Sequence, residues 1–241
     1  MISVFLIGCH ILAKKPLMLI TIDIYSDPIC PWCFIGKRRL NRALKSRPNI
    51  SANIYWHPFQ LNPTMPEHGM ERDTYLISKF GNIEEAKRLY EHIDAVGVRE
   101  EIDFRFNKIE KTPNTVSAHT LIRFAAETKQ SDLIAEALFR AFFLYGRDIG
   151  DATELHKIAT GCGLDGEAFI EFTQSASARS QVQDEDTVGR RIGIDGLPFF
   201  IIDGEYALSG AQEPEAMHNI FDMVLENKRN QNTAASAIVN Q

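Results

Sequence analysis

Residues 19–33 read Leu-Ile-Thr-Ile-Asp-Ile-Tyr-Ser-Asp-Pro-Ile-Cys-Pro-Trp-Cys, and this stretch decides the fold. Its first seven residues are rich in β-branched side chains and predict a short strand. The Ser-Asp-Pro that follows interrupts the strand, and the pattern of residues 31–46 is helical. Residues 53–57 predict a second strand. The sequence therefore predicts a βαβ unit with a Cys-X-X-Cys pair at the start of its helix.

Cys30 and Cys33 lie on the first turn of the predicted helix. Unpaired backbone N–H groups and the helix dipole favour negative charge there, so we expect Cys30 to be an activated thiolate. Cys33, one turn along, is placed to resolve a mixed disulfide formed at Cys30. Pro31 and Trp32 carry no positive charge. The helix start then provides most of the stabilisation of the thiolate, and we expect a less oxidising couple than that of a dedicated periplasmic oxidant.

The number and spacing of the four cysteines argue against a zinc site and against a disulfide scaffold. A structural zinc site usually takes four ligands, and the sequence has no second close Cys pair and no closely spaced histidines, so we expect no metal. A disulfide scaffold would be denser in cysteine and shorter. Cys162, between two glycines, is predicted to be a small, inert residue. Thiol redox chemistry is the use that remains.

The composition sets limits on the class of protein and on its partners. The 241 residues are 44% hydrophobic and 24% charged, which excludes a collagenous or wholly disordered chain. The net charge of -6 argues against nucleic acid as a partner. The apolar residues 1–13 are too short to span a bilayer, and Lys14 and Lys15 follow them rather than precede them as in an export signal. We expect residues 1–17 to be a disordered extension, the location to be cytoplasmic, and no membrane partner.

The remaining sequence divides into a helical middle and a late β hairpin. Helix-capping signals occur at Asn82 and Asp151, whereas strand patterns are scarce between residues 64 and 180. Two short β patterns flank Asp203-Gly204, which is typical of a two-residue hairpin turn. An amphipathic helix is predicted to end near residue 228. The predicted parts are two halves of one domain at 18–63 and 181–228, a helical insertion at 64–180, and a disordered tail at 229–241.

Two motifs together carry a resemblance to a known family. The stretch 26–33 follows a strand, and residues 196–200, Gly-Leu-Pro-Phe-Phe, precede the hairpin. With the segments 114–119 and 145–150, they resemble the DsbA-like thioredoxin superfamily and, within it, the FrnE-like branch of dithiol-disulfide isomerases and oxidoreductases. The resemblance covers residues 19–228. It implies an α/β thioredoxin fold with a large all-helical insertion, and a cis Leu197–Pro198 peptide facing the dithiol.

The resemblance also implies a function, a thiol-disulfide oxidoreductase or isomerase that acts on disulfide-containing client proteins or glutathione. Cys30 would attack and Cys33 would resolve. Pro31, Trp32, Leu197 and Pro198 would contact the substrate. A separate reductase or oxidant would recycle the dithiol, and no cofactor is expected beyond glutathione as a co-substrate.

Residues after the hairpin suggest a glutathione contact, with an equally simple alternative. In the related glutathione-dependent isomerases and kappa-type transferases, the segment that matches Gly210, Ala211 and Gln212 contacts the γ-glutamyl group. Free N–H groups at a helix start suit a carboxylate. Capping of the last helix explains the same residues.

Two other functions remain open on the same fold. One is a glutathione-dependent isomerase or transferase of the 2-hydroxychromene-2-carboxylate isomerase type, a family that has serine where Cys30 stands. The other is a non-catalytic adaptor that holds a client in its cleft. The presence of both sulfurs counts against each of them.

Three further features have structural interpretations that we prefer. Six basic residues on or just after the first helix could attract anions, but we expect a solvated face: Lys37, Arg38, Arg39, Arg42, Lys45 and Arg47. His119 is predicted to be a structural histidine. Trp32 is expected to be exposed as part of a docking surface, with Phe34 and Ile35 packed inward.

Overall fold

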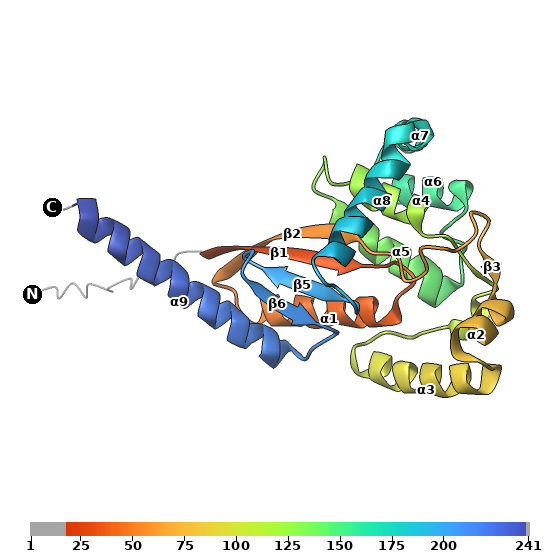
Figure 1. Ribbon diagram of the computed structural model, residues 1–241, viewed down its shortest axis with the longest axis horizontal. Helices are drawn as coiled ribbons and strands as arrows, with labels where there is room; N and C mark the ends of the chain where they lie inside the picture. The colour runs from red at the N-terminus through yellow and green to blue at the C-terminus, as the bar shows by residue number, and fades with distance from the viewer. Residues whose placement is uncertain (1–17, 240–241) are drawn as a thin grey trace, which may run out of the picture.

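The computed structural model describes residues 18–239, and its centre is a four-stranded mixed sheet of order β2-β1-β5-β6 (Figure 1). Strand β1 (Met18–Ser26) is parallel to β2 (Ile50–Pro58) and antiparallel to β5 (Phe199–Ile202). Strand β6 (Tyr206–Ser209) completes the hairpin with β5. The predicted βαβ unit and hairpin are both confirmed, and together they form a thioredoxin fold.

Helices α1 (Pro31–Lys45) and α9 (Pro214–Val239) cover one face of this sheet. Side chains alternate between the two faces of a strand, and Ile20, Ile22 and Ile24 of β1 all point to this face. They pack there with side chains of both helices and of β5, such as Leu40, Phe200 and Phe221. This layer fixes the position of α1 relative to the strand that precedes it.

Helix α9 is longer than the sequence predicted. It continues to Val239, so residues 229–239 are helical rather than a disordered tail. The stretch is rich in polar residues but contains no glycine or proline, the residues that would end a helix. Residues 1–17, predicted as a disordered extension, and residues 240–241 lie outside the described part of the chain.

The segment between β2 and β5 is mainly helical, as predicted. Asn82 and Asp151 accept the expected capping bonds from the N–H groups of Glu85 and Glu154. Two very short strands form an antiparallel pair, so the segment is not entirely helical. In order, its elements are β3 (Met70–Glu71), α2 (Arg72–Phe80), α3 (Ile83–Arg99), a 3-10 turn (Phe106–Lys108), β4 (Lys111–Thr112), α4 (Val116–Phe124), α5 (Ser131–Tyr145), α6 (Ala152–Gly161), α7 (Gly166–Gln174) and α8 (Ala176–Arg191).

Helix α8 crosses the predicted boundary at 180/181 and packs on the opposite face of the sheet from α1. Asp186 accepts a hydrogen bond from the Gln60 N–H group at 2.7 Å, and Arg190 donates one to the Gln60 carbonyl at 2.6 Å. A methyl group at Gly189 would lie 3.1 Å from the rings of Tyr25 and Phe59. The end of α8 therefore packs against the thioredoxin sheet, although the start of the helix lies within the predicted insertion.

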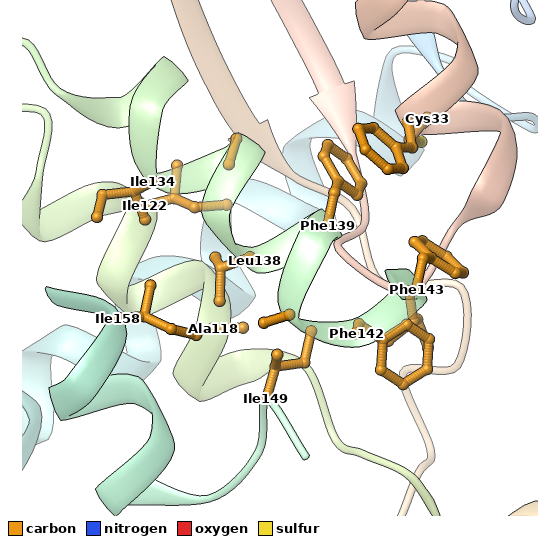
Figure 2. Close-up of a cluster of buried hydrophobic side chains, with 14 of the residues drawn as sticks. Cys33, Ala118, Ile122, Ile134, Leu138, Phe139, Phe142, Phe143, Ile149 and Ile158 are labelled. Carbon is orange, nitrogen blue, oxygen red and sulfur yellow. The ribbon is translucent and has the colours of Figure 1, made fainter. Parts of the chain in front are cut away.

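The largest buried cluster joins the insertion to the beginning of α1. Phe34 of α1 stacks on Phe139 of α5 with ring centroids 5.2 Å apart, and Cys30 and Cys33 belong to the same cluster. Figure 2 shows Cys33 beside Phe139 at one end of the cluster and Ile158 near the other. No helix among residues 18–239 is both long and apolar enough to cross a lipid bilayer.

The basic side of α1 is only in part the solvated face that the sequence predicted, with Arg42 and Lys45 exposed. Lys37 and Arg39 are buried, and Lys37 binds Asp132 of α5 at 2.9 Å. Arg39 binds Glu100, just after α3, at 2.8 Å. These carboxylates are far away in sequence, which is why the run of basic residues alone suggested solvent. The ion pairs instead fasten α1 to the insertion.

Candidate active site

Both cysteines lie on the first turn of α1, where the sequence placed them. Cys30 is the N-cap in an extended conformation (φ −90°, ψ 112°), and Pro31 occupies the first turn. The Cys33 N–H group donates to the Cys30 carbonyl at 3.1 Å, and the Cys30 N–H group donates to the Asp27 carbonyl at 2.9 Å. These bonds hold both thiols on one rigid turn.

The two thiols are nearly covered by their surroundings. Cys30 is 4% exposed and Cys33 is 1% exposed. Burial raises the pKa of Cys33 well above its ordinary value, and the neighbouring Cys30 raises it further, while the Ser26 hydroxyl and the Asp27 backbone N–H group oppose the rise. Cys33 is therefore a neutral thiol near neutral pH.

Asp27 and His119 lie behind the dithiol as a buried pair. The Asp27 carboxylate accepts hydrogen bonds from the N–H groups of Leu61 at 2.7 Å and Ile29 at 3.3 Å. Burial raises the pKa of Asp27 to about 7 and lowers that of His119 to about 3. His119 Nε2 lies 3.8 Å from Asp27 Oδ1 and has no hydrogen-bond partner among the described residues.

Sequence reasoning gave His119 a structural role and Asp27 no role. The signal for Asp27 was present, because an acidic residue three positions before Cys30 follows a buried strand. Its burial depends on Leu61 and His119, however, which are distant in sequence. Among residues 18–239, no group of three or more His, Cys, Asp or Glu side chains is arranged to hold a metal ion.

The loop before β5 lies against α1 close to the dithiol. The Leu197–Pro198 peptide is cis, as the resemblance implied. A methyl group at Gly36 would lie 2.7 Å from Pro198 Cγ and 3.6 Å from Ala211 Cβ, so both residues border the second turn of α1. Leu197 packs on the cluster that contains the two cysteines.

The segment Gly210–Gln212 is bonded mainly to its own turn. The Gly210 N–H group donates to the Pro198 carbonyl at 2.8 Å, and the Gln212 N–H group donates to the Gly210 carbonyl at 2.9 Å. The Gln212 side-chain amide donates to the Ser209 carbonyl at 2.8 Å. Ala211 and Gly210 therefore border the site, whereas Gln212 is exposed at its edge.

Helix α3 of the insertion reaches the other side of the dithiol. The Trp32 ring lies 6.1 Å from the His92 ring, and Trp32 is partly buried rather than fully exposed. Phe34 and Ile35 are completely buried, as predicted. Cys162 is partly exposed at the end of α6 and forms no disulfide with a described cysteine.

A thioredoxin fold with a Cys-Pro-Trp-Cys turn at a helix start and a cis-proline loop beside it defines the class of dithiol oxidoreductases. The sequence profile of the DSBA-like thioredoxin domain matches residues 21–222, and the chain belongs to this family. The DsbA-like resemblance is thus confirmed, and the FrnE-like branch is consistent with it.

Solved structures show the same architecture. The chain is 26% identical to the probable DsbA oxidoreductase of Streptomyces coelicolor, with a TM-score of 0.77 over 86% of this chain and 90% of that one. The cytosolic disulfide reductase DsbM of Pseudomonas aeruginosa, solved with GSH, is 17% identical, with a TM-score of 0.62 over 86% and 99% of the two chains. A 2-hydroxychromene-2-carboxylate isomerase is 14% identical, with a TM-score of 0.63 over 89% and 98%. The last two likenesses concern the fold alone.

Proposed function

We propose that this protein exchanges thiols and disulfides with Cys30 as the attacking residue and Cys33 as the resolving residue. The observation that carries the proposal is the placement of both sulfurs on the first turn of α1, with Cys30 at the cap and Cys33 buried behind it. Backbone N–H groups at a helix start carry partial positive charge, which suits a site where a sulfur attacks and leaves. The buried Cys33 keeps its proton until the mixed disulfide has formed.

The proposed reaction has two exchange steps. The Cys30 thiolate attacks one sulfur of a substrate disulfide, so a mixed disulfide forms and the other substrate sulfur leaves as a thiolate. Cys33 then loses its proton and attacks the Cys30 sulfur, which releases the second substrate thiol. The substrate disulfide is reduced and the dithiol is oxidised to a disulfide. A recycling reductase restores the dithiol, and the reverse sequence oxidises a substrate.

Substrate contacts are proposed for the residues that border this turn. Pro31 and Trp32 lie between the two cysteines. Pro198 borders the second turn of α1 and Leu197 packs on the cluster that contains the cysteines, so an extended segment of a client protein could pair along this loop. Ala211 and the neighbouring Gly210 and Gln212 are proposed as a contact for glutathione. Because the N–H groups of Gly210 and Gln212 already have partners within the chain, we expect this contact to be weak.

We propose that the substrates are disulfide-containing proteins or glutathione disulfide, and that the protein acts in the cytoplasm. The acidic net charge of -6 supports a partner other than nucleic acid.

Insulin reduction and reactivation of a scrambled disulfide substrate test this function. We expect the wild-type protein to be active and Cys30→Ser to lose more than about 100-fold of the activity, because the nucleophile is gone. Cys33→Ser should accumulate mixed disulfides, identifiable by mass spectrometry. Cys162→Ser is the matched control and should keep full activity. A wild-type protein that is inactive on both substrates would overturn the proposal.

A glutathione-dependent isomerase is the second candidate, favoured by the shared fold of the isomerase structure. Such an enzyme has no need of a second thiol at Cys33. Turnover of a 2-hydroxychromene-2-carboxylate that requires glutathione and survives in Cys33→Ser would identify it. We expect no such turnover.

A further inference from the structure

The Ser26 hydroxyl is buried and has no hydrogen-bond partner among the described residues. Ser26 ends strand β1 and is 3% exposed, and its carbonyl accepts a hydrogen bond from the Phe59 N–H group at 3.1 Å. The hydroxyls of Ser46 and Ser131 each donate to a nearby carbonyl at 2.9 Å. A buried hydroxyl without a partner costs free energy. The cost indicates that the Ser26 hydroxyl has a role other than stability.

Ser26 directly precedes the turn that carries the dithiol, and its hydroxyl faces Cys33. The Cys30 N–H group donates to the Asp27 carbonyl and the Cys33 N–H group donates to the Cys30 carbonyl, so a continuous set of bonds fixes the chain from Asp27 to Cys33. The Ser26 hydroxyl lowers the pKa of Cys33 and so opposes the effect of burial. A hydroxyl lowers the pKa of a thiol when it donates a hydrogen bond to the thiolate.

A cavity of about 590 Å³ is lined by Ser26 together with residues of β2 and α4. Trp56 Nε1 and His119 Nε2 belong to two other residues of this lining, and neither atom has a hydrogen-bond partner within the described part of the chain. Phe139 lies beside Cys33 in Figure 2 and contacts Trp56 edge-on at 6.2 Å, so the cavity adjoins the dithiol. The lining also includes exposed residues of β2, and the cavity therefore gives solvent water a place beside Ser26.

The two charge states of Cys33 make different demands on Ser26. Cys33 is a neutral thiol before the resolving step, and the Ser26 hydroxyl then has no partner. When Cys33 loses its proton, the hydroxyl has a charged acceptor in front of it. Hydrogen bonds to a charged group are stronger than those to a neutral one. An interaction that gains strength only as the charge develops accelerates the step in which the charge appears.

We infer that Ser26 is a further catalytic residue of the resolving step, in which its hydroxyl donates a hydrogen bond to the Cys33 sulfur as this sulfur loses its proton. The proton passes to water in the cavity. The Cys33 thiolate attacks the Cys30 sulfur, the bond between Cys30 and the substrate sulfur breaks, and the substrate leaves as a thiolate. This inference rests on the proposed function, because it adds a residue to the same reaction.

Stopped-flow reaction with the aromatic disulfide dithionitrobenzoate separates the two exchange steps. Cys9→Ser and Cys162→Ser together remove the other two cysteines and provide the background for all variants. Attack by Cys30 releases one coloured thiolate at a rate that depends on the reagent concentration. Attack by Cys33 on the mixed disulfide releases a second one at a rate that does not. The second phase therefore reports the resolving step alone.

In Ser26→Ala we expect the second phase to be about three- to tenfold slower at pH 7 and the first phase to be unchanged. Loss of a hydrogen bond to a charged group lowers the thiolate fraction by about ten- to a hundredfold. The more basic thiolate that remains is a better nucleophile, which restores about half of this loss on a logarithmic scale. The urea midpoint of Ser26→Ala should not fall, because the hydroxyl that is removed has no partner in the described chain.

Two further variants show whether the hydroxyl itself is responsible. Ser26→Thr keeps a hydroxyl and should keep the rate of the second phase within about twofold. Ser131→Ala is the matched control, because Ser131 is a buried serine of the same cavity lining whose hydroxyl donates to the Ile122 carbonyl. Its second phase should be unchanged.

Several results would overturn the inference. These are an unchanged second phase in Ser26→Ala, an equal slowing of both phases, an equal slowing in Ser131→Ala, and a threonine variant as slow as the alanine variant. A lower urea midpoint together with a slower second phase means that Ser26 acts through the fold, and it overturns the inference as well. Release of fewer than two thiolates by the protein with Ser26 intact overturns the proposed function itself, so the two failures are distinguishable.

Discussion

Burial raises the pKa of Asp27 and lowers the pKa of His119, although the two side chains lie 3.8 Å apart. The pKa of Asp27 is raised from 3.8 to about 7, so its contribution to stability is complete below pH 3.8 and is lost as the pH rises through about 7. The pKa of His119 is lowered from 6.5 to about 3, so its contribution is complete above pH 6.5 and is lost as the pH falls through about 3. Between pH 3.8 and pH 6.5, a rise in pH therefore lowers the stability through Asp27 and raises it through His119.

Single substitutions should separate the two contributions to the pH dependence of the free energy of unfolding. In Asp27→Asn the free energy of unfolding should rise between about pH 4 and pH 6.5, because the His119 titration is no longer opposed by that of Asp27. In His119→Gln it should fall over about pH 4 to pH 7, by up to roughly 4 kcal/mol. Urea unfolding at several pH values measures both slopes. The wild type and the double variant should be flatter, and parallel curves for all four proteins would contradict the assignment.

Single residues also show what the sequence can predict. Cys30, Cys33, Pro31 and the cis Leu197–Pro198 peptide follow from local motifs, and the structure places them as expected. Asp27 gains its importance from Leu61 and His119, which are distant in the sequence. A local pattern contains no information on which charges lose their contact with water.

Helix α1 depends on charges supplied by other elements. Arg39 Nε lies 2.8 Å from Glu100 Oε1, and Arg42 lies 2.8 Å from Glu100 Oε2, so one buried carboxylate serves two guanidinium groups. Arg39 also binds Glu213, just before α9, at 2.6 Å. Through these pairs α1 is attached at once to the end of α3 and to the start of α9.

Removing the shared carboxylate should weaken this attachment. Glu100→Gln leaves the buried Arg39 with only the exposed Glu213 as a charge partner, and we expect a loss of about 3 kcal/mol in the free energy of unfolding. Urea unfolding near neutral pH measures it. Asp222→Asn breaks the exposed pair with Arg47 and should cost less than about 1 kcal/mol. Similar losses for both variants would mean that the buried network has no special role.

Element boundaries were predictable where a capping residue marks them, as at Asn82 and Asp151. The pair of short strands β3 and β4 was not, because two residues per strand give no periodicity. The carboxylate partners of α1 were equally hidden, since ion pairs across elements leave no trace in local sequence spacing.

For the whole molecule, the insertion and the thioredoxin unit share one hydrophobic cluster. Phe34 of α1 lies among Phe139, Phe143 and Phe104, all from the inserted segment. Trp56 of β2 contacts Phe139 edge-on at 6.2 Å. The predicted limits of the insertion at 64 and 180 therefore separate segments of the chain but do not separate two hydrophobic cores.

This shared core predicts cooperative unfolding. The two tryptophans, Trp32 and Trp56, belong to the thioredoxin unit but touch the insertion, whereas far-UV circular dichroism reports mainly on the inserted helices. We expect tryptophan fluorescence and circular dichroism to give the same urea midpoint, because neither unit keeps a complete core without the other.

A cavity made in the insertion should then destabilise the whole chain. Leu138 of α5 is fully buried, and Leu138→Ala should lower the free energy of unfolding by about 2–5 kcal/mol and shift both probes together. Leu133→Ala, at an exposed position on the same helix, is the matched control and should change little. If Leu138→Ala instead shifts circular dichroism while fluorescence stays in place, the insertion unfolds on its own. It would then be a separate lid, and the contact of His92 with Trp32 beside the dithiol would depend on a moving part.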